Sequence, residues 1–128
     1  MHFGLFQLYK LEKFQTTKES ISTVLAGFQK EGNSNGYEIF TVKGWDYAAL
    51  CETYEKAVAI AREQHVPVLV HVEEMTQPQG HSTSGSHERY KSKERLQWEK
   101  DWDCIAKFRE HLISSGIATA DQDFMARF

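Results

Sequence analysis

The sequence predicts an α/β fold, a partial doubly wound parallel sheet followed by a C-terminal helical tail. Two stretches rich in β-branched and aromatic residues, 37–42 and 66–72, predict strands. Between them lies a segment of about 18 residues with helical periodicity. Strand, helix and strand in this order form a βαβ unit, whose two strands run parallel. With 128 residues the chain has the length of a single domain, 1–128.

The N-terminal third is expected to contribute one helix. Thr16 and Glu19 have the spacing of a capping box, and Gly32 is expected to be the C-cap. The buried stripe of this helix is predicted from apolar residues at positions i, i+3, i+4 and i+7: Ile21, Val24, Leu25 and Phe28. The apolar residues before it, 1–15, fit neither period and are interpreted as an extended segment.

The helix of the βαβ unit is expected to begin after Asp46, a suitable N-cap, and Pro67 prevents its continuation. Its apolar face is predicted to comprise Leu50, Tyr54, Ala57, Val58 and Ala61. The strand at 66–72 shows no polar alternation until His71, which is typical of a strand covered on both faces.

Three N-terminal caps are predicted in the C-terminal tail. Ser92 is expected to cap a helix that carries Leu96, Trp98 and Trp102, whose aromatic side chains are expected to pack on the sheet. Asp103 is expected to cap a second helix that ends at Gly116, with Ile105, Phe108 and Leu112 on its buried stripe. Thr119 and Gln122 have the spacing of a third capping box.

Composition and charge indicate a soluble, cytoplasmic protein. The net charge of −3 and the pI near 6.1 argue against nucleic acid or an anionic membrane as the main partner, and no run approaches the length of a membrane-spanning helix. A local basic patch remains open, formed by Arg89, Lys91, Lys93 and Arg95. Cys51 and Cys104 form no CxxC motif and are expected to be reduced thiols in the core.

The polar loop after the second strand holds the only cluster with evident reactive potential, residues 80–87 (GHSTSGSH). His81 is a candidate general acid/base because imidazole titrates near neutral pH, and the alternative is a surface histidine. A zinc site of His71, His81 and His87 lacks a recognised ligand spacing. GxSxG, P-loop and GxGxxG motifs are absent from the sequence. Glu73 and Glu74 either pair with basic neighbours or form a solvated strand end.

The loop resembles a specific family, the α-type region of thiamine diphosphate-dependent 2-oxo acid dehydrogenase E1 components of the branched-chain, 2-oxoisovalerate type. The match covers roughly residues 15–122, and its specific part is Gly80-His81-Ser82-Thr83-Ser84, with Tyr90 at the family's distance from His81. Upstream and downstream it is carried by Gly44-Trp45-Asp46-Tyr47, Ala61-Arg62, Pro67-Val68-Leu69, and Asp103-Cys104-Ile105 to Gly116.

The resemblance implies an oxidoreductase with the thiamine diphosphate-binding fold and with thiamine diphosphate and Mg²⁺ as cofactors. His81 would line the cofactor channel and assist acyl transfer to the lipoyl arm, with Ser82 beside it. Ser82, Ser84, Tyr90 and Ser92 would belong to a regulatory loop, in which Ser82 and Ser92 take the places of phosphorylated serines. The implied partners are an E1 β-type region or subunit and the lipoyl domain of E2, and a homo-oligomer is expected.

The sequence also departs from the family pattern. Met75-Thr76-Gln77-Pro78 carries no cation where the family has a diphosphate-binding arginine, Gly85-Ser86 replaces an acidic pair, and Lys91 replaces an arginine. The family's metal and diphosphate motif, G-D-G…N-N, is absent from this sequence. The chain is therefore expected to be the C-terminal part of an E1 α-type domain and to be inactive in isolation. The alternative is a truncated, non-catalytic interaction module.

Overall fold

A pair of parallel strands lies at the centre of the computed structural model, which describes residues 16–76 and 91–119. Strand β1 (Glu38–Lys43) pairs with β2 (Val68–Glu73) in a register that sets Glu38 opposite Val68 and Lys43 opposite Glu73. The predicted strands and the mixed α/β class are confirmed. A doubly wound continuation, the thiamine diphosphate-binding fold and the single domain stay predictions, because the described residues form a sheet of two strands.

Helix α3 (Tyr47–Ala59) connects the two strands and continues as a π-helical turn, Ile60–Gln64. The predicted cap is confirmed, since the Asp46 carboxylate accepts a hydrogen bond from the Ala49 N–H at 3.0 Å. The predicted apolar face is only partly buried: Ala57 is buried, whereas Tyr54 and Val58 remain 49% and 45% exposed. Two strands cover a narrow face of the helix, so the apolar stripe extends beyond the surface that they shield.

The segment before β1 differs from its prediction. A 3₁₀ turn (Thr17–Glu19), helix α2 (Ile21–Val24) and a second 3₁₀ turn (Leu25–Phe28) replace one regular helix. The Thr16 side chain forms no capping hydrogen bond, and extended backbone at Ser20 interrupts the helix. Gly32 lies beyond the last helical turn, in a tight turn closed by the Ser34 N–H and the Glu31 carbonyl, so the predicted C-cap is wrong.

The predicted buried stripe of this segment is largely exposed. Ile21, Val24 and Phe28 are 44%, 40% and 57% exposed. Their periodicity is helical, but the described residues supply no apolar surface opposite them that is wide enough to bury them. Phe28 instead stacks on Tyr37, with ring centroids 6.0 Å apart.

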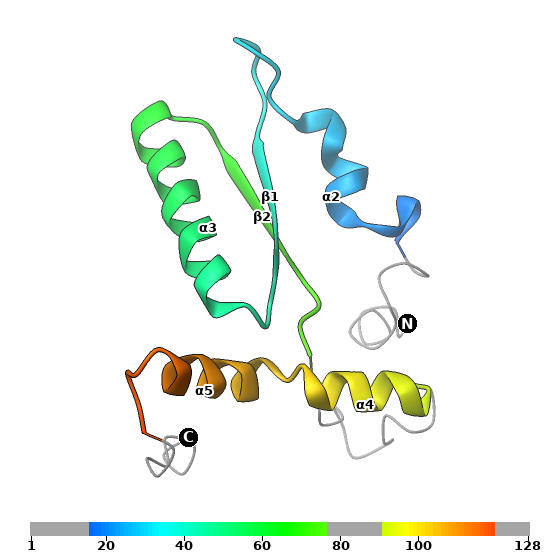
Figure 1. The fold of residues 1–128 in the computed structure, drawn as a ribbon. Helices are drawn as coiled ribbons and strands as arrows, with labels where there is room; N and C mark the ends of the chain where they lie inside the picture. The colour runs from blue at the N-terminus through cyan, green and yellow to red at the C-terminus, as the bar shows by residue number, and fades with distance from the viewer. Residues whose placement is uncertain (1–15, 77–90, 120–128) are drawn as a thin grey trace, which may run out of the picture.

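Helices α4 (Lys93–Asp101) and α5 (Cys104–Ser114) lie across the end of the strand pair at which both strands finish, and α2 and α3 flank the strands (Figure 1). Both predicted caps are confirmed: Ser92 accepts from the Arg95 N–H at 3.2 Å, and Asp103 from the Ala106 N–H at 2.9 Å. Helix α5 ends in a Schellman motif with Gly116 at φ 70°, as predicted for a glycine C-cap. The third capping box lies partly outside the described residues, because Gln122 is not among them.

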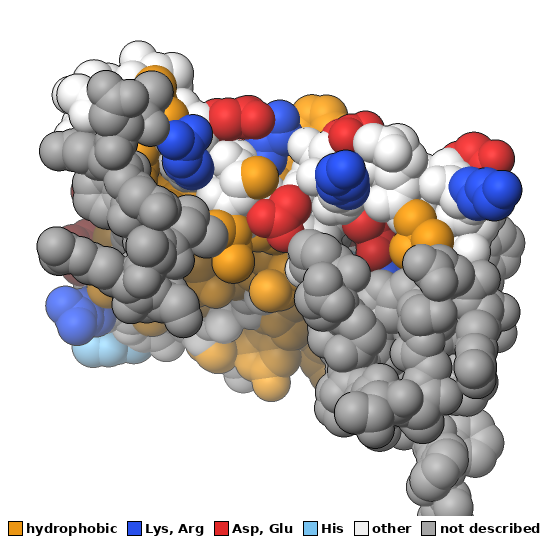
Figure 2. All heavy atoms as spheres, turned by 90° about the horizontal axis from the view of Figure 1, so that it is seen from below, with side chains coloured by type: hydrophobic (Ala, Val, Ile, Leu, Met, Phe, Trp, Pro, Cys, Tyr) orange, Lys and Arg blue, Asp and Glu red, His pale blue; other side chains and the backbone are white. Residues whose placement is uncertain are grey.

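Few side chains are buried. Among the described residues, the buried apolar side chains are Val42, Ala57 and Ala118. Ile105 and Phe108 of α5, predicted to be buried, are 54% and 37% exposed. Figure 2 shows acidic and basic side chains interspersed over the face of α4 and α5, with hydrophobic side chains visible between them. No described helix has the length and apolar character needed to cross a membrane.

The two cysteines are free thiols, as predicted, but neither lies in the core. Cys51 is exposed on α3, and Cys104 is partly buried at the start of α5. The predicted burial of Cys51 is wrong: at the i, i+3, i+7 spacing it shares a side of α3 with Tyr54 and Val58, which are also exposed. The extended segment predicted at 1–15 lies outside the described residues.

Candidate functional site

Charged side chains from both strands meet at the carboxyl edge of the sheet. Lys43 at the end of β1 contacts Glu73 Oε2 at 3.2 Å and Glu74 Oε1 at 2.8 Å through its Nζ. The indole N–H of Trp45 donates to the other oxygen of Glu74 at 2.9 Å. Of the two possibilities that the sequence left open, ion pairing of Glu73 and Glu74 is therefore the one observed.

The backbone turns sharply at Glu74, whose φ of 54° is uncommon for a residue with a side chain. Partial burial raises the pKa of the Glu74 carboxyl, but the hydrogen bonds from Lys43 and Trp45 outweigh it and bring the pKa below its ordinary value. The same contact with Glu74, against some desolvation, raises the pKa of the Lys43 ammonium group. The left-handed turn at Glu74 is thus held by two donors, Lys43 at the end of β1 and Trp45 in the connection to α3.

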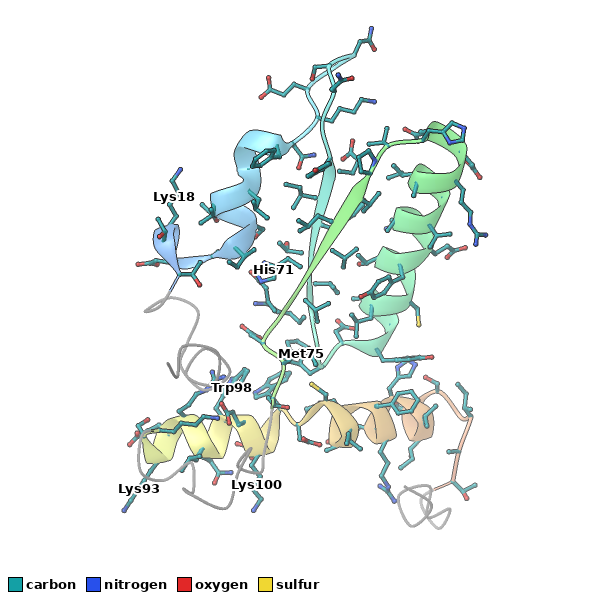
Figure 3. All side chains as sticks on the ribbon, turned by 180° about the vertical axis from the view of Figure 1, so that it is seen from behind. Lys18, His71, Met75, Lys93, Trp98 and Lys100 are labelled. Atoms are coloured by element: carbon teal, nitrogen blue, oxygen red, sulfur yellow. The ribbon has the colours of Figure 1, made fainter. Side chains whose placement is uncertain are left out.

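Three tryptophans pack beneath this edge. The rings of Trp45 and Trp102 have centroids 4.4 Å apart, and those of Trp98 and Trp102 are 6.4 Å apart. Cations flank the group: the Arg95 guanidinium lies 4.4 Å from the Trp98 ring, and Lys107 Nζ lies 4.9 Å from the Trp102 ring. In Figure 3, Trp98 points from α4 toward the strand end where Met75 lies, whereas Lys93 and Lys100 point away from it. The ring contacts of Trp98 and Trp102 are thus with each other and with Trp45, after the end of β1, whereas the sequence predicted packing on the sheet.

Thr76, the last described residue before the GHSTS loop, is tied to the junction of α4 and α5. Its hydroxyl donates to the Trp102 carbonyl at 3.3 Å and accepts from the Cys104 N–H at 3.2 Å. The Cys104 N–H is one of the free donors at the start of a helix, so Thr76 acts as a cap contributed from a distant segment. The entry to the loop is therefore fastened to the tail helices.

The first described residue after the loop is fastened to the same helices. Lys91 pairs through its Nζ with Glu99 Oε2, and the Lys91 and Glu99 side chains are only 3% and 6% exposed. Arg95 pairs with the second oxygen of Glu99 at 2.8 Å. Lys91 does not contribute to the basic patch that the sequence left open, because its side chain is buried against Glu99, and Arg95 pairs with the same carboxylate. Arg89 lies outside the described residues.

The proposed loop residues His81, Ser82, Ser84 and Tyr90 lie outside the described residues. Ser92 is described, and it is the exposed N-cap of α4. The hydrogen bonds of the Glu94 carboxylate, first to its own backbone N–H and then to Ser92, lower the pKa of Glu94. The exposed Ser92 thus hydrogen-bonds to both the Arg95 N–H and the Glu94 carboxylate, and it lies at a helix N-terminus, which favours negative charge.

His71, the described member of the possible zinc set, takes part in a different arrangement. Its Nδ1 lies 3.2 Å from Ser22 Oγ and 3.9 Å from Glu73 Oε1. A serine–histidine–acid relay needs the serine and the acid on opposite ring nitrogens, so this grouping is not a catalytic triad. His81 and His87 are outside the described residues, within which no group of three or more His, Cys, Asp or Glu side chains could hold a metal ion.

The described residues do not by themselves fit thiamine diphosphate and its metal. A diphosphate needs uncommitted cations or a bound metal, and the cations nearest the carboxyl edge are paired: Lys43 with Glu73 and Glu74, and Arg95 with Glu99. Met75 and Thr76 contribute no cation at the position where the resembled family has an arginine.

Four residues that make these contacts were not predicted as site residues from the sequence: Lys43, Trp45, Thr76 and Glu99. The spacing of Arg95 and Glu99, i and i+4 on a predicted helix, could have indicated their ion pair. The contacts of Lys43, Trp45 and Thr76 span 26–31 residues of sequence, and no local pattern encodes them.

Comparison with known proteins gives one family. The family model described as "Dehydrogenase E1 component" matches residues 15–125. The chain is 27% identical over 120 residues to the pyruvate dehydrogenase E1 component subunit alpha of Rickettsia bellii, covering 91% of this chain and 36% of that protein. The proteins of the same name from Rickettsia prowazekii and Rickettsia typhi are each 28% identical, over 80% and 93% of this chain and 31% and 37% of their own lengths. The chain thus spans about a third of these relatives. No solved structure matches it significantly.

Proposed function

Since the chain belongs to the dehydrogenase E1 component family, we propose that it is part of an enzyme that oxidatively decarboxylates a 2-oxo acid and passes the acyl group to a lipoyl domain of E2. Thiamine diphosphate with Mg²⁺ would supply the electron sink for decarboxylation. The contribution of this chain is the GHSTS loop, and the chain alone is expected to be inactive because the metal and diphosphate motif, G-D-G…N-N, is absent from this sequence.

The observation that carries this function is the fastening of the loop. Residues 74–76, which precede the loop in the sequence, follow the carboxyl end of β2, the edge at which open α/β sheets place their ligands. Thr76 and Lys91, on either side of the loop, are both bound to the tail helices. A histidine used in proton or acyl transfer must be held within a fraction of an ångström of its productive position, which two fixed loop ends favour. His81 is proposed as that group, with Ser82 beside it.

Two 2-oxo acids are candidate substrates for this function. The curated relatives are named for pyruvate, whereas the GHSTS loop resembles the branched-chain type. We propose a branched-chain 2-oxo acid on the basis of the loop, with pyruvate as the competing substrate. The ratio of kcat/KM for 2-oxoisovalerate and pyruvate decides between them.

We also propose partner subunits, a regulatory modification and a cellular location for this chain. An E1 β-type region or subunit would supply the other face of the cofactor site, and the assembly would be homo-oligomeric and cytoplasmic. Phosphorylation at Ser82 or Ser92 would place negative charge on the loop or on its boundary. The exposed Ser92 hydroxyl supports access for a modifying enzyme at that position.

Calorimetric titration with thiamine diphosphate and MgCl₂ tests the chain, with His81→Ala as the control variant. We expect no heat of binding for either protein at micromolar concentration. Micromolar binding by the chain would overturn the inference that its cofactor site is incomplete.

The activity itself is tested on the contiguous reading frame, extended upstream of Met1 by sequencing the adjoining DNA. The extended protein with an E1 β-type subunit is expected to reduce an artificial electron acceptor when a 2-oxo acid is added. His81→Ala should lower acylation of a lipoyl domain on the order of 100-fold, the lower end of the usual general acid–base contribution. Absence of 2-oxo acid-dependent turnover in the extended protein would refute the function.

A non-catalytic interaction module is the second candidate function. It is favoured by the paired state of the cations at the carboxyl edge and by the exposure of apolar side chains such as Ile21 and Phe28. A frame that closes directly upstream of Met1, without the metal motif, would support this candidate.

A further inference from the structure

Helix α3 carries an exposed apolar stripe along one side. Spacings of four, three and four residues place its members on the same side of the helix: Tyr47, Cys51, Tyr54 and Val58. The two tyrosines and Val58 are each between 44% and 49% exposed, and Cys51 is exposed as well. Ala57, on another side of α3, is buried, and α3 forms the left-hand margin of the molecule in Figure 1. Contiguous apolar side chains on a surface are typical of an interaction site.

The stripe continues onto α5 at the N-terminal end of α3. The rings of Tyr47 and Phe108 have centroids 4.6 Å apart, and Phe108 is itself 37% exposed. The Tyr47 hydroxyl is hydrogen-bonded to the Cys51 thiol, and this contact raises the pKa of Tyr47. A polar group that is already paired costs less to remove from water than an unpaired one. This end of the stripe can therefore be covered without leaving the Tyr47 hydroxyl unsatisfied.

The spacing of the stripe reads the same in both directions along the helix. In an antiparallel pair of α3 helices related by a twofold axis, Tyr47 of one copy is level with Val58 of the other, and Cys51 is level with Tyr54. Apolar side chains then meet apolar side chains along the whole stripe, and both copies use the same residues, as a twofold interface requires. Val58 of each copy would pack on the ring pair of Tyr47 and Phe108 in the other.

The charges beside the stripe are compatible with the same pairing. Glu52 and Lys56 pair with each other within α3 at 3.9 Å, so together they add no net charge to its flank. Glu55 of one copy would be level with Leu50 of the other, and the two Glu55 residues would lie about 7.5 Å apart along the helix axis, at about 1.5 Å per residue. Each Glu55 carboxylate is then closer to the N-terminal turn of the opposing α3, whose partial positive charge attracts an anion.

We propose that two copies of this chain associate through the stripe, with α3 of one copy packed antiparallel against α3 of the other. A second copy is the occupant because the stripe is complementary to itself in both spacing and charge. With Phe108 the stripe supplies five side chains per copy, well below the roughly 20–30 residues of a standard stable interface, so we expect a weak dimer with a Kd on the order of 100 μM. This interface is independent of the dehydrogenase chemistry proposed above.

Sedimentation velocity of the full chain under reducing conditions, from about 10 μM to about 500 μM, measures the association. Val58→Glu places a carboxylate against the apolar stripe of the other copy and should raise the Kd at least about 10-fold. Val24→Glu is the matched control, because Val24 is a helical valine of α2 with similar exposure, 40%, and it lies outside the stripe. Tyr54→Glu is the second stripe variant if Val58→Glu does not fold, with folding checked by far-UV circular dichroism.

Cys51 reports the helix pair without any change to the stripe. Packed helices have axes about 8–10 Å apart, so a short bismaleimide can join the two Cys51 thiols of an α3 pair. We expect a cross-linked dimer from the parent and from Cys104→Ser, and none from Cys51→Ser. Val24→Glu should cross-link as the parent does, whereas Val58→Glu should give at least about fivefold less dimer at the same concentration.

Three results would overturn this interface: a monomer at every concentration, equal association of Val58→Glu and the parent, or a cross-link that requires Cys104. Protection of Cys51 from maleimide in a monomeric, upstream-extended protein would show that another part of the polypeptide covers the stripe, which also overturns it. These measurements need no cofactor and no turnover. A missing 2-oxo acid activity would therefore count against the proposed function alone.

Discussion

The hydroxyl of Thr76 is the contact whose removal best tests how the loop is attached. Thr76→Val preserves the β-branched shape and removes only the hydroxyl, which donates to the Trp102 carbonyl at 3.3 Å and accepts from the Cys104 N–H at 3.2 Å. Each net hydrogen bond in a folded protein contributes about 0.5–1.5 kcal/mol. Both distances lie at the long end of the range for good hydrogen bonds, so we expect a loss of about 1–2 kcal/mol in the free energy of unfolding.

Urea denaturation of the parent and of Thr76→Val measures this loss, with Thr41→Val as a control at an exposed position of β1. The melting temperature should fall by roughly 4 °C for each kcal/mol in a chain of this size. Amide exchange should also accelerate at Cys104, because its N–H loses its partner. A loss below about 0.3 kcal/mol, with exchange at Cys104 unchanged, would refute the role of Thr76 as a cap of α5.

Three further perturbations follow from the structure. Asp103→Ala should lower the free energy of unfolding by about 1 kcal/mol because it removes the cap of α5. Thr16→Ala removes no capping hydrogen bond and should leave the free energy of unfolding almost unchanged. Equal losses of unfolding free energy for the two variants in urea denaturation would contradict this. Val42→Ala, at a buried position of β1, should cost about 1–2 kcal/mol from the area removed from the interior, and a neutral result in the same assay would show that this core is not well packed. The Glu74 pKa lies below its ordinary 4.5, so its stabilising contribution is complete above that pH and is lost as the pH falls through the folded-state pKa. Because the pKa of Lys43 is raised, its contribution to the free energy of unfolding is complete below pH 10.5 and is lost as the pH rises through the folded-state pKa. Lys43→Met should weaken the pH dependence of stability in both the acidic and the alkaline range, as measured by urea denaturation at a series of pH values. An unchanged pH dependence would contradict the pairing of Lys43 with Glu74.

The parts of the fold that were predictable are those encoded by neighbouring residues. The caps Asp46, Ser92 and Asp103 were identified from residue type and position, and each accepts the backbone hydrogen bond expected of it. The parallel strand pair followed from two β-rich runs separated by a helical segment. The caps depend on interactions within a few residues, and the strand pair, although its partners are far apart in the chain, follows from the order of locally recognisable strands and helix.

Local patterns failed in the segment before β1. Thr16 and Glu19 have the spacing of a capping box, but the chain adopts left-handed backbone at Lys18 and Glu19 and restarts its helix after Ser20. The apolar stripe that includes Ile21 and Phe28 has helical spacing and yet stays exposed. Periodicity states which side chains share a face, and burial further requires a surface opposite that face.

By itself the sequence determined the α/β class, the order of the strands and helices, the capped starts of α3, α4 and α5, and the GHSTS loop that carries the family resemblance. Only the tertiary structure decided how that loop is held: Thr76 binds the start of α5, and Lys91 is neutralised by a buried Glu99. It also decided that Lys43 and Trp45 hold the turn at Glu74. The physical reason is that no local pattern encodes these contacts. Lys43 and Glu74 are 31 residues apart and meet through the parallel pairing of β1 and β2, and Thr76 meets Cys104 only where the tail helices lie at the end of β2.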